Sequence, residues 1–282
     1  MSSGDDPRAQ MLARWEQAAP GWARRADRLR EGAMPVSLWM VDHVDLQPGQ
    51  RVLELAAGPG DTGFLAAELI APGGTLVCSD ASEAMLDIAR ARADAFGLKN
   101  VEFARLELEW IDLETASVDA VLCRWGVMLL VDPPAALTEI RRVLRPGGRA
   151  TFAVWDVAER NPWATVPGRA LIELRHADPP DPKAPGMFAM AAPGQIEAML
   201  GDAGFVDVTV DAIQLDRTYT ELDEFVAEAL DLFRPFIEVY EALDDSQRQA
   251  VRRKIAELAE PYVDDSGGVR LPGRALVAAA SA

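Results

Sequence analysis

The sequence has little cysteine, little histidine and no long uncharged apolar run. Its two cysteines, Cys78 and Cys123, both lie in apolar segments typical of buried strands, so no disulfide framework is expected. No eighteen uncharged apolar residues occur together, and the first ten residues, MSSGDDPRAQ, contain no basic stretch followed by an apolar run. We therefore expect neither a membrane span nor a secretion signal, and a cytoplasmic location.

Basic residues are also scarce relative to acidic ones. The chain has 28 Lys and Arg against 45 Asp and Glu, which gives a formal net charge of −17. Such a surface repels the phosphate backbone of nucleic acids and anionic lipid alike, and it favours solubility. The expected partner is therefore a small molecule, with no nucleic acid and no membrane. A monomer or a homodimer is compatible with these data.

The middle of the chain alternates between two kinds of segment. Apolar runs typical of buried strands occupy residues 51–57, 75–79, 101–104, 118–123 and 149–155, and helical patterns lie between several of them, at 61–70, 82–96 and 133–144. This order is typical of right-handed β–α–β units with helices on both faces of the sheet. We predict an α/β fold with a doubly wound, mostly parallel seven-stranded Rossmann-like sheet.

The two ends of the chain differ from this core. Residues 7–44 have a helical pattern with a predicted break at Pro20 and Gly21, and residues 158–193 are too rich in proline to form one long regular element. Further on, we predict a helix at 192–203, a strand at 204–215, mostly helix at 221–261 and a last strand at 268–280. The predicted parts are N-terminal helices covering the site (1–49), a Rossmann-like core that binds the cofactor (50–156), a proline-rich substrate cap (157–192), and a C-terminal completion of the sheet (193–282) with a helical insertion (220–262).

The most informative motif is VLELAAGPGDTG, in which a strand runs into a glycine turn and a helix. Gly58, Gly60 and Gly63 satisfy GxGxxG, which taken alone is a weak indication of a dinucleotide site. Glu54 separates two interpretations, because a carboxylate in this strand repels a pyrophosphate but suits a ligand with an ammonium and a sulfonium group.

Asp80 follows at the end of the second predicted strand, in SDASEAML. An acid at this point accepts hydrogen bonds from both hydroxyls of a ribose, in nucleotide sites and S-adenosylmethionine (SAM) sites alike. The alternative is a helix cap or turn aspartate. Ala81 and Met85 would border the adenine, although a single Met on a helix is more often core.

Five motifs in this order resemble those of the class I SAM-dependent methyltransferases, most closely the UbiE-like branch of quinone and natural-product enzymes: VLELAAGPGDTG, SDASEAML, LELEWIDL, VDAVLCRWGVMLL and EIRRVLRPGGRATFAVW. The resemblance is strong from about Trp15 to Trp163. It implies SAM as cofactor, S-adenosylhomocysteine (SAH) as product, and no metal.

The resemblance also implies roles for individual residues. Glu54 corresponds to the acid that meets the methionyl ammonium, Glu107 to the acid that meets the adenine amino group, and Arg124 to a position whose backbone touches the methionine end. The chain departs from the family at Ala56, which replaces the first loop glycine, and at Glu107, where Asp is usual. Glu107 and Glu109 have an alternative interpretation as a solvated loop pair. The complete set of candidate cofactor-binding residues is Glu54, Ala56, Gly58, Gly60, Thr62, Asp80, Ala81, Met85, Glu107, Leu108, Glu109 and Arg124.

Methyl transfer from a sulfonium needs positioning more than it needs a catalytic side chain. A hydroxyl acceptor must still lose a proton, and His43 and His176 are the two histidines of the chain, the residue type whose reference pKa lies near neutrality. His43 precedes the first strand and is interpreted as structural. His176, in the predicted cap, is the candidate base, with a surface loop histidine as the alternative; Asp156 or an acidic acceptor would serve as well.

Large apolar residues suggest a lipophilic or aromatic methyl acceptor, since acceptor pockets are concave and mainly apolar. Each candidate residue, taken alone, is more often core. Two other functions stay open: an NAD(P)-dependent oxidoreductase, and a SAM-binding protein that transfers nothing. The candidate acceptor residues are Trp15, Trp22, Trp125, Trp163, Phe188 and Met190.

Overall fold

The computed structural model describes residues 6–181 and 184–282. Its β-strands form one seven-stranded sheet in the order β3-β2-β1-β4-β5-β7-β6. The strands β1 to β5 are parallel, whereas β7 pairs antiparallel with both β5 and β6. The predicted doubly wound, mostly parallel sheet is therefore confirmed. The strands are β1 (Arg51–Leu55), β2 (Thr75–Asp80), β3 (Val101–Arg105), β4 (Val118–Arg124), β5 (Leu144–Trp155), β6 (Val206–Tyr219) and β7 (Val269–Ser281).

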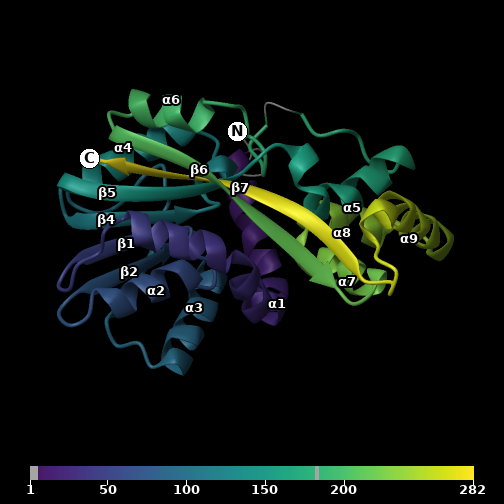
Figure 1. Ribbon diagram of the computed structural model, residues 1–282, viewed down its shortest axis with the longest axis horizontal. Coiled ribbons are helices and arrows are strands. Elements are labelled where there is room, and N and C mark those ends of the chain that lie inside the picture. Colours follow the sequence, from purple (N-terminus) through teal and green to yellow (C-terminus); the bar gives the residue numbers. More distant parts are fainter. Residues whose placement is uncertain (1–5, 182–183) are drawn as a thin grey trace.

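Helices cover both faces of this sheet (Figure 1). The helix α1 packs against α2 and α3, and α4 packs against α6. The central strands β1 and β4 are almost wholly buried, which explains their continuous apolar runs. The helices are α1 (Pro7–His43), α2 (Asp61–Leu69), α3 (Glu83–Phe96), α4 (Pro133–Val143), α5 (Pro162–Glu173), α6 (Gln195–Asp202), α7 (Leu222–Leu232), α8 (Arg234–Ala242) and α9 (Asp245–Ala259), with short 3₁₀ turns η1 (Val127–Leu129), η2 (Ala158–Arg160) and η3 (Glu260–Tyr262).

The strands β6 and β7 continue beyond the rest of the sheet. The register of β7 with β5 runs only from Ala275 to Ser281, whereas its register with β6 reaches back to Val269, which lies opposite Tyr219. The outer half of this pair is a two-stranded ribbon that carries the predicted helical insertion, α7 to α9 (Figure 1). This ribbon and the helices α7 to α9 form a second lobe beside the sheet. The helix α5, which lies in the proline-rich segment, packs on α8, α9 and β7 and so contributes to this second lobe.

The long helix α1 lies between the two lobes (Figure 1). The predicted break at Pro20 and Gly21 is wrong, because α1 is continuous from Pro7 to His43. Proline removes one helical hydrogen bond, but here the helix is held from outside by packing on α2, α3 and α7. Two arginines of α1, Arg24 and Arg25, both pair with Asp231 of α7.

A buried carboxylate reinforces this junction between α1 and the second lobe. Glu228 of α7 is only 2% exposed. It accepts hydrogen bonds from Arg28 of α1 at 2.6 Å, from Arg217 of β6 at 2.6 Å and from the Tyr219 hydroxyl at 2.9 Å. Three donors on one carboxylate compensate for its burial, so the lobe and α1 form one packed unit.

None of the helices in the described part of the chain is both long enough and apolar enough to cross a membrane.

The contact between α1 and α7 yields a test of this packing. A Cβ atom added at Gly21 would lie 1.9 Å from the carbonyl oxygen of Asp231, whereas one added at Gly32, also in α1, meets nothing within 4 Å. We expect Gly21→Ala to lower the free energy of unfolding by about 1–3 kcal/mol through steric conflict. Gly32→Ala should raise it by about 0.5–1 kcal/mol through helix propensity. Urea unfolding followed by circular dichroism measures both, and shifts of the same sign would contradict the described packing.

Candidate functional site

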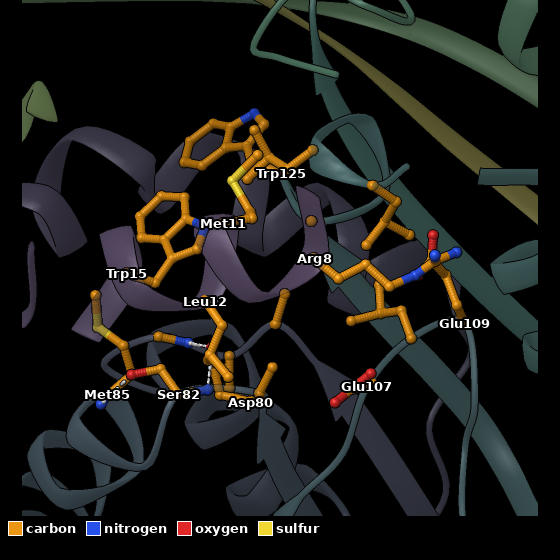
Figure 2. Close-up of a pocket in the computed structure, with 18 of the residues that line it drawn as sticks. Arg8, Met11, Leu12, Trp15, Asp80, Ser82, Met85, Glu107, Glu109 and Trp125 are labelled. Carbon is orange, nitrogen blue, oxygen red and sulfur yellow. Dashed lines mark hydrogen bonds and ion pairs between the residues drawn. The ribbon is translucent and has the colours of Figure 1, made fainter. Parts of the chain in front are cut away.

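A cavity of about 370 Å³ lies at the carboxyl ends of β1, β2 and β4. Ligands of open parallel sheets bind at this edge, where the strand order reverses. The first turns of α1 form its roof, with Arg8, Leu12 and Trp15 above Asp80 and Glu107 (Figure 2). The lining residues are Asp6, Arg8, Ala9, Met11, Leu12, Trp15, Trp22, Ala56, Ala57, Gly58, Pro59, Asp80, Ala81, Ser82, Met85, Glu107, Leu108, Glu109, Arg124, Trp125, Gly126, Leu129, Leu130 and Val131.

The glycine turn after β1 forms part of the floor. Gly58 and Gly60 have φ angles of +53° and +87°, the left-handed region that glycine enters without strain. Ala56, which stands where the family has its first loop glycine, also has a positive φ, +50°. Its backbone is therefore not in ordinary strand geometry. Trp125, after β4, has φ +59°. Two non-glycine residues in this region thus flank one crevice, a pattern found at functional sites.

Asp80 joins this turn to the end of β2. Its Oδ2 accepts a hydrogen bond from the Gly58 amide at 2.9 Å, and its Oδ1 accepts one from the Ser82 amide at 2.9 Å. Burial raises the pKa of Asp80 in spite of these bonds, and the nearby Glu16 of α1 adds to the rise. A carboxylate has about four acceptor positions, so Asp80 keeps capacity for ligand hydroxyls. Of the alternative roles proposed for Asp80, Ser82 fills that of the helix cap, whereas the bond from the Ser82 amide gives Asp80 the role of a turn aspartate as well.

The residues predicted to contact the adenine line the cavity, but Glu109 already has protein partners. Its Oε2 accepts from Arg8 Nε at 2.5 Å, and its Oε1 accepts from the Asp132 amide at 2.6 Å. Glu109 therefore fastens the start of α1 over the cavity (Figure 2). Leu108 is buried and lines the cavity beside Glu107.

Glu54, in β1 two residues before the lining residue Ala56, does not belong to the described lining. It is 3% exposed, and its Oε1 accepts a hydrogen bond from the Gly63 amide at 2.8 Å. Burial is the main cause that raises its pKa to about 7, and the Asp61 carboxylate adds to the rise. The Gly63 amide, the Arg124 guanidinium and the Cys78 thiol act in the opposite direction. An ammonium beside Glu54 would favour its ionised form.

Two other predicted cofactor residues do not line the cavity. Thr62 is fully buried, and its hydroxyl bonds that of Ser37 in α1 at 2.9 Å, so it joins two helices. Gly60 caps α2 behind the turn, where a Cβ would come within 2.4 Å of the Phe64 ring. The remaining nine candidates, besides Glu54, line the cavity together: Ala56, Gly58, Asp80, Ala81, Met85, Glu107, Leu108, Glu109 and Arg124.

The acceptor candidates divide in a similar way. Trp15, Trp22 and Trp125 line the cavity, and the rings of the first two meet edge to face at 5.6 Å. Trp163 is 2% exposed and is separated from the cavity by Trp155, whose ring stacks on Trp125 at 4.3 Å. The structure therefore places Trp163 in the core.

The predicted cap contributes none of its described residues to the lining of the cavity. Three candidates from residues 157–192 besides Trp163 are absent from its described lining: Phe188, Met190 and the candidate base His176. The His176 amide donates to the Leu171 carbonyl at the end of α5, on the second lobe. His43 stacks on Trp39 at 3.8 Å, in keeping with its structural interpretation.

Sequence reasoning predicted that N-terminal helices cover the site, but it missed several residues of this roof. Arg8, Met11 and Leu12 line the cavity together with the predicted Trp15. The spacing of the apolar residues Met11, Leu12 and Trp15 could have identified this lining, because residues three and four apart lie on one face of a helix. The apolar run Leu129–Leu130–Val131 after β4 was a second signal.

Comparisons with known proteins agree with this geometry. Residues 46–175 match the family model described as a methyltransferase domain. The matched part of the chain is similar to the class I SAM-dependent methyltransferases of the UbiE-like type, whose methyl donor is SAM.

Individual relatives cover different parts of the chain. A ubiquinone/menaquinone biosynthesis C-methyltransferase UbiE of Xanthomonas oryzae is 28% identical over 59% of this chain and 70% of its own length. A demethylmenaquinone methyltransferase of Clavibacter sepedonicus is 41% identical over 36% of this chain and 39% of its own length. The chain spans between 39% and 70% of the length of the curated relatives it matches. The solved YcgJ protein of Bacillus subtilis shares the fold, with a TM-score of 0.60, 17% identity, and coverage of 87% of this chain and 97% of that one.

The buried Glu54 gives a pH-dependent prediction. Because its pKa is raised from 4.5 to about 7, the folded protein holds this proton more tightly than the unfolded chain does. Its contribution to stability is therefore fully present below pH 4.5 and is lost as the pH rises toward about 7, by up to about 3 kcal/mol.

The variant Glu54→Gln removes this titration and retains an acceptor for the Gly63 amide. As the pH rises from 5 to 8, the free energy of unfolding of the variant should rise relative to that of the parent by up to about 3 kcal/mol. Urea unfolding of the ligand-free protein at both pH values measures this change. A constant difference between the two proteins would refute the raised pKa.

Proposed function

We propose that this protein transfers a methyl group from SAM to a small, lipophilic or aromatic acceptor. The observation that carries the proposal is the convergence of nine predicted cofactor residues on one cavity, in a chain whose residues 46–175 match a methyltransferase domain. The names of the Xanthomonas and Clavibacter relatives, which refer to quinone biosynthesis, support a lipophilic acceptor.

Each part of the cavity has a role in this function. Asp80 accepts hydrogen bonds from the ribose, Ala81 and Met85 border the adenine with Glu107 and Leu108, and the glycine turn allows close approach of the ligand to the backbone. When bound, SAM supplies a methyl group on a positively charged sulfur, which leaves without needing a proton. The protein's contribution is therefore to orient the two reactants and exclude water.

The acceptor would lie against the aromatic part of the cavity. Trp15, Trp22 and Trp125 are joined there by Met11 and by the apolar residues that follow η1. An apolar wall of this kind favours a flat, lipophilic molecule. The position of His176 on the second lobe gives no support to a role as general base, so the acceptor we propose is acidic enough to react without one.

Two other functions make different predictions for one experiment. Calorimetric titration with SAM, SAH and NAD should show binding of both adenosyl ligands and none of NAD. Binding of NAD alone would refute the methyltransferase and favour the oxidoreductase. Methyl-labelled SAM, incubated with a broad panel of phenols, quinols and carbon acids, should label one class of acceptor. Tight SAM binding without transfer over the whole panel would favour a SAM-binding protein that transfers nothing.

Asp80 is the sharpest single test of the cofactor site. The variant Asp80→Ala loses the charge-assisted bonds to the ribose, so its affinity for SAH should fall by about 1.5–3 kcal/mol. Asp87→Ala is a matched control, because Asp87 is an exposed acid of α3 outside the cavity. Its affinity should stay at the parent value. Equal affinities in both variants would refute the assignment of Asp80.

A further inference from the structure

The first turns of α1 cover the cavity without being packed into the core. Arg8 and Trp15 lie over the floor of the cavity (Figure 2). The buried residues of α1 begin at Ala18, and every residue of the helix before it is exposed or half-buried. In proteins, a helix is held in place mainly by the packing of its apolar face. Residues 7–16, called here the roof segment, are therefore the least firmly held part of α1.

A weak point in α1 separates the roof segment from the anchored part of the helix. Pro20 has no backbone N–H, so the Glu16 carbonyl lacks the helical hydrogen bond that residue 20 would otherwise donate. On the other side of this gap, Gly21 packs so closely on α7 that a Cβ would come within 1.9 Å of the Asp231 carbonyl oxygen. The Gln17 side chain bonds α8 at 3.1 Å. The second lobe thus holds α1 next to the proline, where helices bend most readily.

An ion pair joins the far end of the roof segment to the α/β core. Arg8 Nε lies 2.5 Å from Glu109 Oε2, in the segment that follows β3. The Arg8 side chain is 49% exposed, so water can readily replace this contact. Burial raises the pKa of Asp80, and the Glu16 carboxylate of the roof segment adds to the rise, so the closed roof also holds two acids near each other. A weak and separable contact therefore keeps the roof closed.

We propose that the roof segment is a lid that bends at Pro20 to admit and release the cofactor, with Arg8 and Glu109 as its latch. The inference rests on the proposed function, because it takes SAM and SAH as the ligands that pass beneath the lid. The closed lid excludes water from the cavity during transfer, and its opening lets SAH leave. Arg8 is thus a positioning residue, which acts on the ligand through the lid and not by direct contact.

The rates of ligand exchange test the latch. SAH is mixed with the protein in a stopped-flow instrument, and the fluorescence of the tryptophans that line the cavity reports binding. A latch of this kind closes the lid over the empty and the occupied cavity alike, so Arg8→Gln increases the open population of both. The association and dissociation rate constants should both rise by ~2- to 5-fold, which leaves Kd nearly unchanged. Added salt should raise both rate constants of the parent toward those of Arg8→Gln, because it screens an exposed ion pair.

The variant Pro20→Ala tests the bending point with the opposite sign. Pro20 is exposed, so its replacement leaves the packing of α1 intact. Alanine supplies the missing N–H to the Glu16 carbonyl and stiffens the helix, so both rate constants should fall. Arg14→Gln is the matched control, because Arg14 is an exposed arginine of the same segment that does not line the cavity. Its rate constants should stay at the parent values.

Several outcomes would overturn the inference. A rise in Arg8→Gln that is confined to the dissociation rate constant, with an equal loss of affinity, would show that Arg8 contacts the ligand directly. Unchanged rate constants in Arg8→Gln, or a rise of both in Pro20→Ala, would show that no such lid exists. Rate constants of the parent that do not respond to salt would exclude the latch, and this measurement needs no variant to fold. A parent protein that does not bind SAH would instead refute the proposed function, on which the inference rests.

Discussion

The hydrogen bond from the Gly58 amide to Asp80 fixes the geometry of the crevice. It joins the turn after β1 to the end of β2, so the backbone amides and the carboxylate that face the cavity are placed relative to each other by one 2.9 Å contact. The turn reaches this position only because Gly58 adopts a positive φ. The same carboxylate then holds the Ser82 amide at the start of α3. Three consecutive elements thus depend on a single side chain, and the predicted ribose site is also the structural centre of the floor.

The roof of the cavity depends on contacts far from it in sequence. The helix α1 is anchored to α7 by Asp231 and Glu228, and its first turn is fastened by Arg8 to Glu109. Between these points it presents Met11, Leu12 and Trp15 to the cavity. A helix held at two places can close a binding site without belonging to the sheet that builds the floor, so the site combines a rigid α/β core with a separately supported cover.

Much of this arrangement could be predicted from the sequence, and the reasons are local. The strands alternate with helices over residues 51–155, and each glycine or acid of the floor lies next to a strand end that periodicity identifies. Asp80 and Gly58 could be predicted for this reason. The continuity of α1 through Pro20 could not be predicted, because a helix breaker is tolerated there only through tertiary contacts. The same limit applies to the proline-rich segment, whose helix α5 packs on the second lobe and whose described residues do not line the cavity, and to Thr62, whose hydroxyl bonds that of Ser37.

The ribbon formed by β6 and β7 has a consequence for how such proteins diverge. Tyr219 and Val269 face each other at its outer end, so the chain leaves and re-enters the ribbon at the same place. Additions and deletions among α7, α8 and α9 leave every strand register of the core unchanged. The lobe can therefore be remodelled independently of the crevice, provided that each new version still offers acids where Asp231 and Glu228 now meet the arginines of α1.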